Sequence, residues 1–193
     1  MRKFNGVLVL VMALFLVVGI SSMVMAYGCS CGGFGWNCCD MGDDATIVQA
    51  GSQNYASIYQ RGETYFNLPW YFGGNPCLPP GCVTGGNHAV VMQLGYLNNT
   101  TVTQIGSLNS VFTFAFGGEN DMVITQHGTK LLANVMQAGH NNQAFVNQSG
   151  VLNDANVGQI GLFNIASITQ TKHRDLANVL QIGCSNEAYI TQD

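Results

Sequence analysis

Seven cysteines are the most reactive residues of this 193-residue chain, and six of them lie in two short segments. One segment holds Cys29, Cys31, Cys38 and Cys39, and the other holds Cys77 and Cys82. The spacing lacks the paired C-x-x-C units of a structural zinc site, so we expect disulfide bonds, with a metal or redox site as the alternative. Such bonds would tether or staple their own segments, and reduction should leave the β content of the chain intact. Cys184 would stay free or pair between molecules.

Histidines and carboxylates give little support for catalysis. The histidines at 88, 127, 140 and 173 have no matched nucleophile, and the carboxylates are scattered rather than clustered, so we expect no enzyme, no metal and no cofactor. Charged residues make up only 8% of the chain, against about 25% in an ordinary globular protein. Six Lys and Arg residues and a formal net charge of −4 give no basic surface for nucleic acid.

Glutamine indicates a different chemistry, because eleven of the thirteen glutamines recur at intervals that are all multiples of 11 residues. A buried amide has four hydrogen-bonding sites, and most of them are satisfied when identical amides stack about 4.8 Å apart in a ladder. From residue 93 to residue 192 only one register, held by Ala115, lacks glutamine. The ladder candidates are Gln49, Gln60, Gln93, Gln104, Gln126, Gln137, Gln148, Gln159, Gln170, Gln181 and Gln192.

The residues around each glutamine predict a β-strand. A β-branched residue stands two positions before every register, and a small residue, usually Ala, stands four positions before most of them. This alternation has the period of two that places side chains on one face of a strand. Gly follows at two and Asn at five positions after alternate registers, where we expect tight arcs that use their tolerance of positive φ. The arc asparagines are Asn54, Asn98, Asn120, Asn142, Asn164 and Asn186, and the intervening arcs look looser.

The full repeat is therefore 22 residues long, in the order strand, arc, strand, arc. One such unit cannot bury its inner face, but stacked copies can, with each strand pairing in parallel with its equivalent in the next coil. The sequence thus predicts an all-β parallel β-solenoid over residues 45–193, with two facing, cross-β-like sheets. One sheet would carry the glutamines at 49, 93, 137, 159 and 181, and the other sheet would carry the remaining six.

The pattern Q-x-G-x-x-N-x-A-x-x-x-Q resembles the curlin repeat of curli, the bacterial extracellular amyloid fibre. It is intact over residues 49–60, 137–148, 159–170 and 181–192, and the resemblance covers residues 45–62 and 87–193. Residues 129–133 are similar to the nucleating curlin, whereas residues 120–128 are similar to the major subunit, so this choice stays open.

The resemblance implies a secreted structural subunit that assembles head to tail into extracellular fibres at the cell surface, with roles in adhesion and the biofilm matrix. Its partners would be further copies of itself, other curlin subunits and the outer-membrane export machinery. The last coil ends at Gln192-Asp193 without a capping sequence, so it should present its edge to the coil of residues 45–60 in the next subunit.

Residues 27–44 and 63–86 depart from the repeat, and a separate segment precedes both. Residues 1–26 have a positive start, an uncharged apolar run and small residues before a cleavage point, which is typical of a signal peptide; a retained membrane anchor is the alternative, and lipidation at Cys29 is a weak one. Residues 27–44 are Gly-rich and replace the export-targeting segment of curlins. Residues 63–86 hold aromatics, four prolines and two cysteines, and would form an extruded loop or a degenerate coil.

The outward faces of the two sheets differ in polarity. One face carries the apolar residues Met92, Phe112, Phe114 and Met136, which would bind fibres side by side or hold an apolar partner. The alternative is that the aromatic segment 63–86 covers them. The other face carries threonines at 103, 125, 169 and 191, and these keep open the alternative of a monomeric β-solenoid that binds ice or polysaccharide.

Overall fold

The computed structural model describes residues 43–62 and 85–193, and within these ranges it contains twelve strands and no helix. The signal peptide, the six clustered cysteines and most of the 63–86 segment, all expected from the sequence, lie outside the described residues. The strands are β1 (Asp44–Ser52), β2 (Tyr55–Gly62), β3 (His88–Tyr96), β4 (Asn99–Ser107), β5 (Ser110–Gly118), β6 (Asp121–Thr129), β7 (Leu132–His140), β8 (Gln143–Val151), β9 (Asp154–Leu162), β10 (Ile165–Gln170), β11 (Leu176–Cys184) and β12 (Glu187–Gln192). In the described ranges no helix is long and apolar enough to span a membrane.

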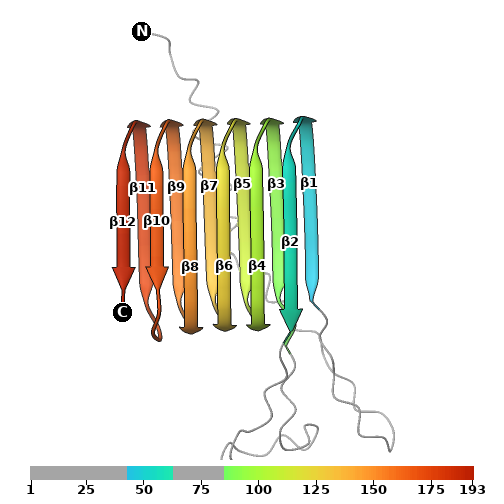
Figure 1. Ribbon diagram of the computed structural model, residues 1–193, viewed down its shortest axis with the longest axis vertical. Coiled ribbons are helices and arrows are strands. Elements are labelled where there is room, and N and C mark those ends of the chain that lie inside the picture. Colours follow the sequence, from blue (N-terminus) through green and yellow to red (C-terminus); the bar gives the residue numbers. More distant parts are fainter. Residues whose placement is uncertain (1–42, 63–84) are drawn as a thin grey trace, which may run out of the picture. The chain divides into compact units, whose positions relative to one another are not determined.

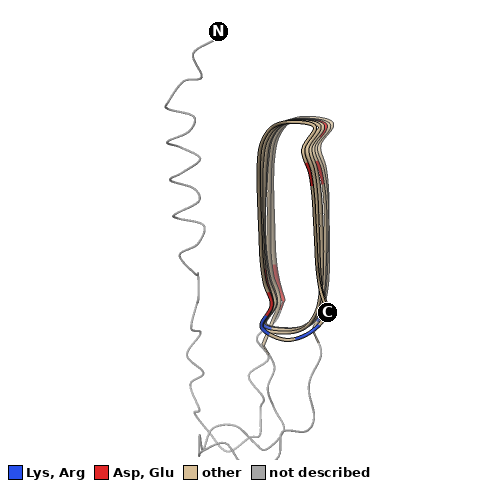
Figure 2. Cartoon of the chain, turned by 90° about the vertical axis from the view of Figure 1, so that its left-hand side faces the viewer, with Lys and Arg blue, Asp and Glu red and all other residues tan. Residues whose placement is uncertain are grey.

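Successive strands alternate between two parallel six-stranded sheets (Figure 1). The first sheet has the order β1-β3-β5-β7-β9-β11, and the second has the order β12-β10-β8-β6-β4-β2. Each strand pairs with its equivalent one coil away, as Gln137 does with Gln159. Viewed down the stack, the coils superpose as an elongated ring (Figure 2). The predicted parallel β-solenoid with a 22-residue repeat is therefore confirmed.

The first coil stacks directly on the second although 44 residues separate their equivalent positions. β1 pairs with β3 through Gln49 and Gln93, and β2 pairs with β4 in the same way. The strands of these two coils therefore pair directly with one another. Joining Gly62 directly to Gly85 would regenerate an intact repeat from Gln60 to Gln93. The intervening 22 residues therefore interrupt a single arc of an otherwise continuous stack.

Small and β-branched side chains fill the core between the two sheets. Buried and partly exposed residues alternate along the inner strands, as the period of two requires. Ala133, Val135 and their equivalents in the inner coils are at most a few per cent exposed, and the glutamine of each inner coil is fully buried beside them. The two sheets lie close enough for one layer of these side chains, because the small residue of one strand faces the glutamine of the opposite strand, as Thr100 faces Gln93.

The sequence predicts positive φ for both the glycine and the asparagine of each arc, and the structure confirms this for the glycine only. The glycine two positions after the register does have positive φ, as at Gly139, where φ is 125°. The ladder asparagines do not; the left-handed residue is the one that precedes them, such as Leu97, Phe163 or Ser185. The intervening arcs have the same left-handed residue at Leu108, Lys130, Leu152 and Arg174, although Lys172 replaces the positive-φ glycine in the last of them. Asparagine is required at this position for its side chain and not for its backbone.

Candidate functional site: amide ladders and two open edges

The buried glutamines form directional hydrogen-bonded ladders. In the second sheet, Gln104 Nε2 donates to Gln126 Oε1 at 2.9 Å, and Gln126 Nε2 donates to Gln148 Oε1 at 2.9 Å. In every such bond the amide donates toward the C-terminal coil. The same ladder runs from Gln60 to Gln192, and in the first sheet it joins Gln49 to Gln93 and then the residues from Gln137 to Gln181.

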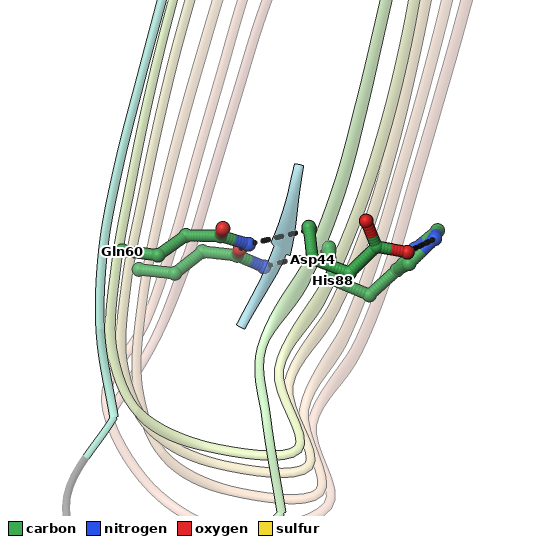
Figure 3. Close-up of polar contacts among 4 residues, drawn as sticks. Asp44, Gln60 and His88 are labelled. Atoms are coloured by element: carbon green, nitrogen blue, oxygen red, sulfur yellow. Dashed lines mark hydrogen bonds and ion pairs between the residues drawn. The ribbon is translucent and has the colours of Figure 1, made fainter. Parts of the chain in front are cut away.

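From Gln60 onward, the second amide hydrogen of each ladder glutamine crosses the core. Gln60 Nε2 donates to the carbonyl oxygen of Asp44 at 3.0 Å, and Gln104 makes the equivalent bond to His88 at 3.1 Å (Figure 3). The side chains of Asp44 and His88 point to the outer side, where a carboxylate oxygen and the imidazole Nε2 are 3.7 Å apart. Because both hydrogens are used, a polar side chain is stable at a fully buried position, and it ties the opposing sheets together.

The first-sheet ladder is broken at Ala115. Gln137 Oε1 is buried and has no hydrogen-bond partner, because the residue one coil before it carries no amide. On the other side of the break, Gln93 Nε2 donates to Thr100 Oγ1 at 2.8 Å, so a threonine on the opposite strand takes the place of the missing acceptor. One coil further, Met122 stands at the position equivalent to Thr100, and both Met122 and Ala115 are fully buried. The larger Met122 side chain thus fills the space that the small Ala115 side chain leaves on the opposite strand.

We expect the double substitution Ala115→Gln with Met122→Ala to stabilise the subunit. The new amide would donate to Gln137 Oε1 and accept from Gln93 Nε2, and satisfying one buried acceptor contributes about 1–2 kcal/mol. Ala115→Gln alone should be neutral or destabilising, because Met122 occupies the space. Urea unfolding of the unassembled subunit measures both. A double variant no more stable than Ala115→Gln would contradict the ladder interpretation.

Asparagines form a second ladder inside the arc that follows each first-sheet strand. Asn120 Nδ2 donates to Asn98 Oδ1 at 2.9 Å and to the Gly139 carbonyl at 3.1 Å, and its backbone N–H also donates to Asn98 Oδ1 at 3.2 Å. The oxygen therefore accepts from the C-terminal side, so this ladder has the opposite polarity to the glutamine ladders. The structure joins all six arc asparagines predicted from the sequence, from Asn54 to Asn186.

Two further rows were missed by sequence reasoning. In the other arc, Asn87, Asn109 and Asn153 accept backbone N–H groups from the next coil, and the ladder position of the first coil is held by Asp43. Asn109 and Asn153 stand five residues after a glutamine register, and this position was the available signal. On the outer face, Asn134, Asn156 and Asn178 are joined by bonds of 2.9 and 3.0 Å.

Asp154 lies beside this outer asparagine row. It pairs along the sheet with Leu132 and Leu176, and the resulting loss of water contact raises the pKa of its carboxyl group. A hydrogen bond of 3.0 Å from Asn156 opposes this effect. The native state therefore favours the protonated form, so this residue supports folding at acidic pH and the support is lost as the pH rises through the raised pKa.

The stack has two open edges. In the described ranges no strand pairs with the outer side of β1 and β2, or with the outer side of β11 and β12. Apolar side chains on both edges are exposed, including Ile47 at 45% on the first edge and Leu180 at 70% on the second. We call them the first edge and the last edge. Open strand edges of this kind recruit further strands unless they are capped.

The unused groups on the two edges are complementary. At the last edge, Gln181 and Gln192 each donate one hydrogen across the core and retain one, while Asn186 Oδ1 accepts nothing within the described residues. At the first edge, Gln49 donates one hydrogen to Gln93 and Gln60 donates both of its hydrogens, and the Oε1 atoms of Gln49 and Gln60 accept nothing from the part of the chain that the structure describes. The glutamine N–H donors of the last edge therefore match the glutamine Oε1 acceptors of the first edge. Two last edges, or two first edges, would not match in this way.

Other residues considered for chemistry are not brought together. In the part of the chain that the structure describes, no group of three His, Cys, Asp or Glu side chains is arranged to hold a metal ion. Cys184 is the described cysteine, and it is exposed and free. Met92, Phe112, Phe114 and Met136 lie partly buried on the outer face of β3, β5 and β7.

Comparison with protein families matches the curlin associated repeat to residues 128–161. The match begins at the end of β6, spans β7 and β8 and ends within β9, so it covers more than one complete coil. A comparison with curated proteins finds no match. The match confirms the resemblance to curlin repeats that the glutamine and asparagine spacing indicates.

Proposed function

We propose that this chain, whose solenoid is built from curlin repeats, is a structural subunit that assembles head to tail into extracellular fibres. One observation carries the proposal: the two open edges expose the same ladder rows with opposite hydrogen-bonding groups. The joint between two subunits would thus repeat the joint between two coils, and no new kind of contact is needed.

The register of the joint follows from the ladders. With the last edge of one subunit on the first edge of the next, β11 would pair with β1 and β12 would pair with β2. Gln181 would donate to Gln49, and Gln192 would donate to Gln60. Apolar positions also coincide, since Val179 meets Ile47 and Ile190 meets Ile58. In the outer row that follows the second-sheet glutamines, Asp193 would lie opposite Arg61, so opposite charges meet.

This architecture suits a secreted fibre subunit better than a catalyst. The recurring amide groups are used inside the stack, and the exposed edge of a folded subunit would template folding of the next chain that arrives. The resemblance to curli supports export across the outer membrane, contacts with other curlin subunits, and roles in adhesion and the biofilm matrix. A nucleating role would show as a shorter lag when trace amounts are added to a major subunit.

The purified protein, diluted from denaturant, should form thioflavin-positive fibres visible by electron microscopy. Fibre diffraction should show the strand spacing of about 4.8 Å along the fibre axis, because strands stack perpendicular to it. Growth should be accelerated by preformed fragments, which carry both edges. A protein that remains monomeric at micromolar concentration for days, even with fragments present, would refute the proposal.

A monomeric binding module is the second candidate, and the threonine row on the second sheet favours it. Thr103, Thr125, Thr169 and Thr191 lie at equivalent outward positions. The row is interrupted by Asn147 and begins with Tyr59, so it lacks the regular flat array of an ice-binding face. A monomer that binds ice or polysaccharide without forming fibres would favour this candidate.

A further inference from the structure

The outer face of the first sheet carries two rows that are apolar throughout. The residues immediately before the registers are Val48, Met92, Phe114, Met136, Gly158 and Leu180. The residues immediately after them are Ala50, Leu94, Phe116, Ala138, Ile160 and Ile182. We call these twelve residues the apolar face.

This face is not a requirement of the fold. The second sheet covers the same core, yet its equivalent rows contain Thr125, His127, Asn147, Ser149 and Thr171. Figure 2 shows the charged residues gathered near the arcs and away from the flat middle of both long sides. Phe116 is 43% exposed, and Ile182 is 68% exposed. Exposed apolar rows of this length usually mark an interaction surface.

We propose that the apolar face binds the apolar face of a second copy, so that two stacks associate side by side. The inference rests on the head-to-tail assembly proposed above, because stacking turns each short row into a continuous stripe. Side chains in these rows repeat once per coil, about 4.8 Å apart. Another stack of the same chain has rows with the same spacing, so their side chains remain in register along the whole contact.

The two rows fit one another in size in the coils of β7 and β9, whereas Phe114 would face Phe116 and Met92 would face Leu94. They flank the glutamine register symmetrically, so a two-fold axis parallel to the stack brings the row before the registers against the row after them. Met136 then lies opposite Ala138 of the second copy, and Gly158 lies opposite Ile160. Large side chains therefore face small ones in these coils, as in a steric zipper.

Polar groups border part of the apolar face on both sides, and Val90, Phe112 and Leu162 extend it in the same bordering rows. The asparagine row of Asn134, Asn156 and Asn178 borders one side, and Tyr96 with His140 borders the other, with the Tyr96 hydroxyl 3.3 Å from His140 Nδ1. An apolar centre with a polar rim is the usual anatomy of a protein interface. No charged residue lies in the twelve positions, so identical faces can meet without repulsion.

The test replaces Leu94, Met136 and Ile160 together by threonine, on strands away from both edges. We expect single fibres in place of bundles, with an unchanged elongation rate, by electron microscopy and thioflavin kinetics. The matched control replaces Thr103, Thr125 and Thr169 by valine on the second sheet, and should bundle as the original protein does. Bundling that persists in the threonine variant would overturn the inference.

A deletion variant tests whether the segment of residues 63–84, rather than a second copy, covers the apolar face. Removal of residues 63–84 joins Gly62 to Gly85 and restores an intact repeat, so the solenoid should fold. Bundling should be the same with and without this segment. If the original protein forms single fibres and only the deletion variant bundles, the segment covers the apolar face and the inference is wrong. Absence of fibres in every variant would instead refute head-to-tail assembly.

Discussion

Replacement of Gly183 by alanine should leave the subunit folded but stop growth at the last edge. Gly183 has a φ of 121°, and a Cβ atom there would meet only Asn186 Nδ2, at 3.5 Å. At the equivalent glycines of inner coils, the added Cβ would overlap the carbonyl oxygen of the glycine one coil further on. At Gly183 this neighbour is absent from the subunit. In an assembled fibre it would be Gly51 of the next copy.

Trace amounts of the Gly183→Ala protein should therefore cap fibres made by the original protein. We expect shorter fibres and slower growth by thioflavin fluorescence, with growth lost at one end only, as seen by imaging of labelled seeds. The backbone strain costs about 1–3 kcal/mol, so circular dichroism should still show a folded subunit. This result would also assign the polarity of the fibre.

The matched control is Gly139→Ala, which carries the same unfavourable φ inside the stack. Its Cβ would overlap the carbonyl oxygen of Gly161 in the same subunit, so the variant should lose stable folding as well as assembly. If Gly183→Ala extends fibres as well as the original protein, the last edge does not bind the first edge in the proposed register.

The glutamine rows and the two sheets were predictable from the sequence, because the 11-residue spacing of the glutamines determines both. A slip of one residue would turn every glutamine from the core to the surface, so the multiples of 11 fix which face each side chain occupies. The break at Ala115 was visible for the same reason. Sheet membership followed from the alternation of registers, as Gln137 and Gln148 illustrate.

Compensations across the core could not be predicted in this way. Thr100 and Met122 make up from the opposite strand for the amide that is missing at Ala115, and the repeat spacing alone does not show that these two positions face the break. The left-handed residues were also hidden, because Leu97 and Phe163 have no intrinsic preference for positive φ. Stacking overrides that preference, since it places the following asparagine in its ladder.

The direction of the hydrogen bonds was a further feature that spacing could not supply. Identical amides can stack with either polarity, and the choice depends on the second hydrogen, which here reaches the opposite strand, as Gln126 reaches the carbonyl oxygen of Ser110 at 3.2 Å. That cross-core bond fixes the amide orientation throughout the ladder. It is also what makes the two edges chemically different.

Removal of a central ladder amide should be the most destabilising single change in the core. Gln126→Ala would leave the Gln104 amide hydrogen and Gln148 Oε1 without partners and would open a cavity between the sheets. Each unsatisfied buried group costs about 1–3 kcal/mol, and the cavity adds to this. We expect about 3–5 kcal/mol less stability by urea unfolding of the unassembled subunit.

The matched variant is Gln192→Ala, which removes the same amide at the last edge. Gln192 accepts from Gln170 and donates to the Leu176 carbonyl, but water reaches this position and can replace the lost partners. Its cost in the subunit should therefore be about 1 kcal/mol or less. Its cost in the fibre should rise toward that of Gln126→Ala, because the next copy would bury the site. Equal losses for the two variants in the unassembled subunit would mean that the ladder contributes little beyond side-chain volume.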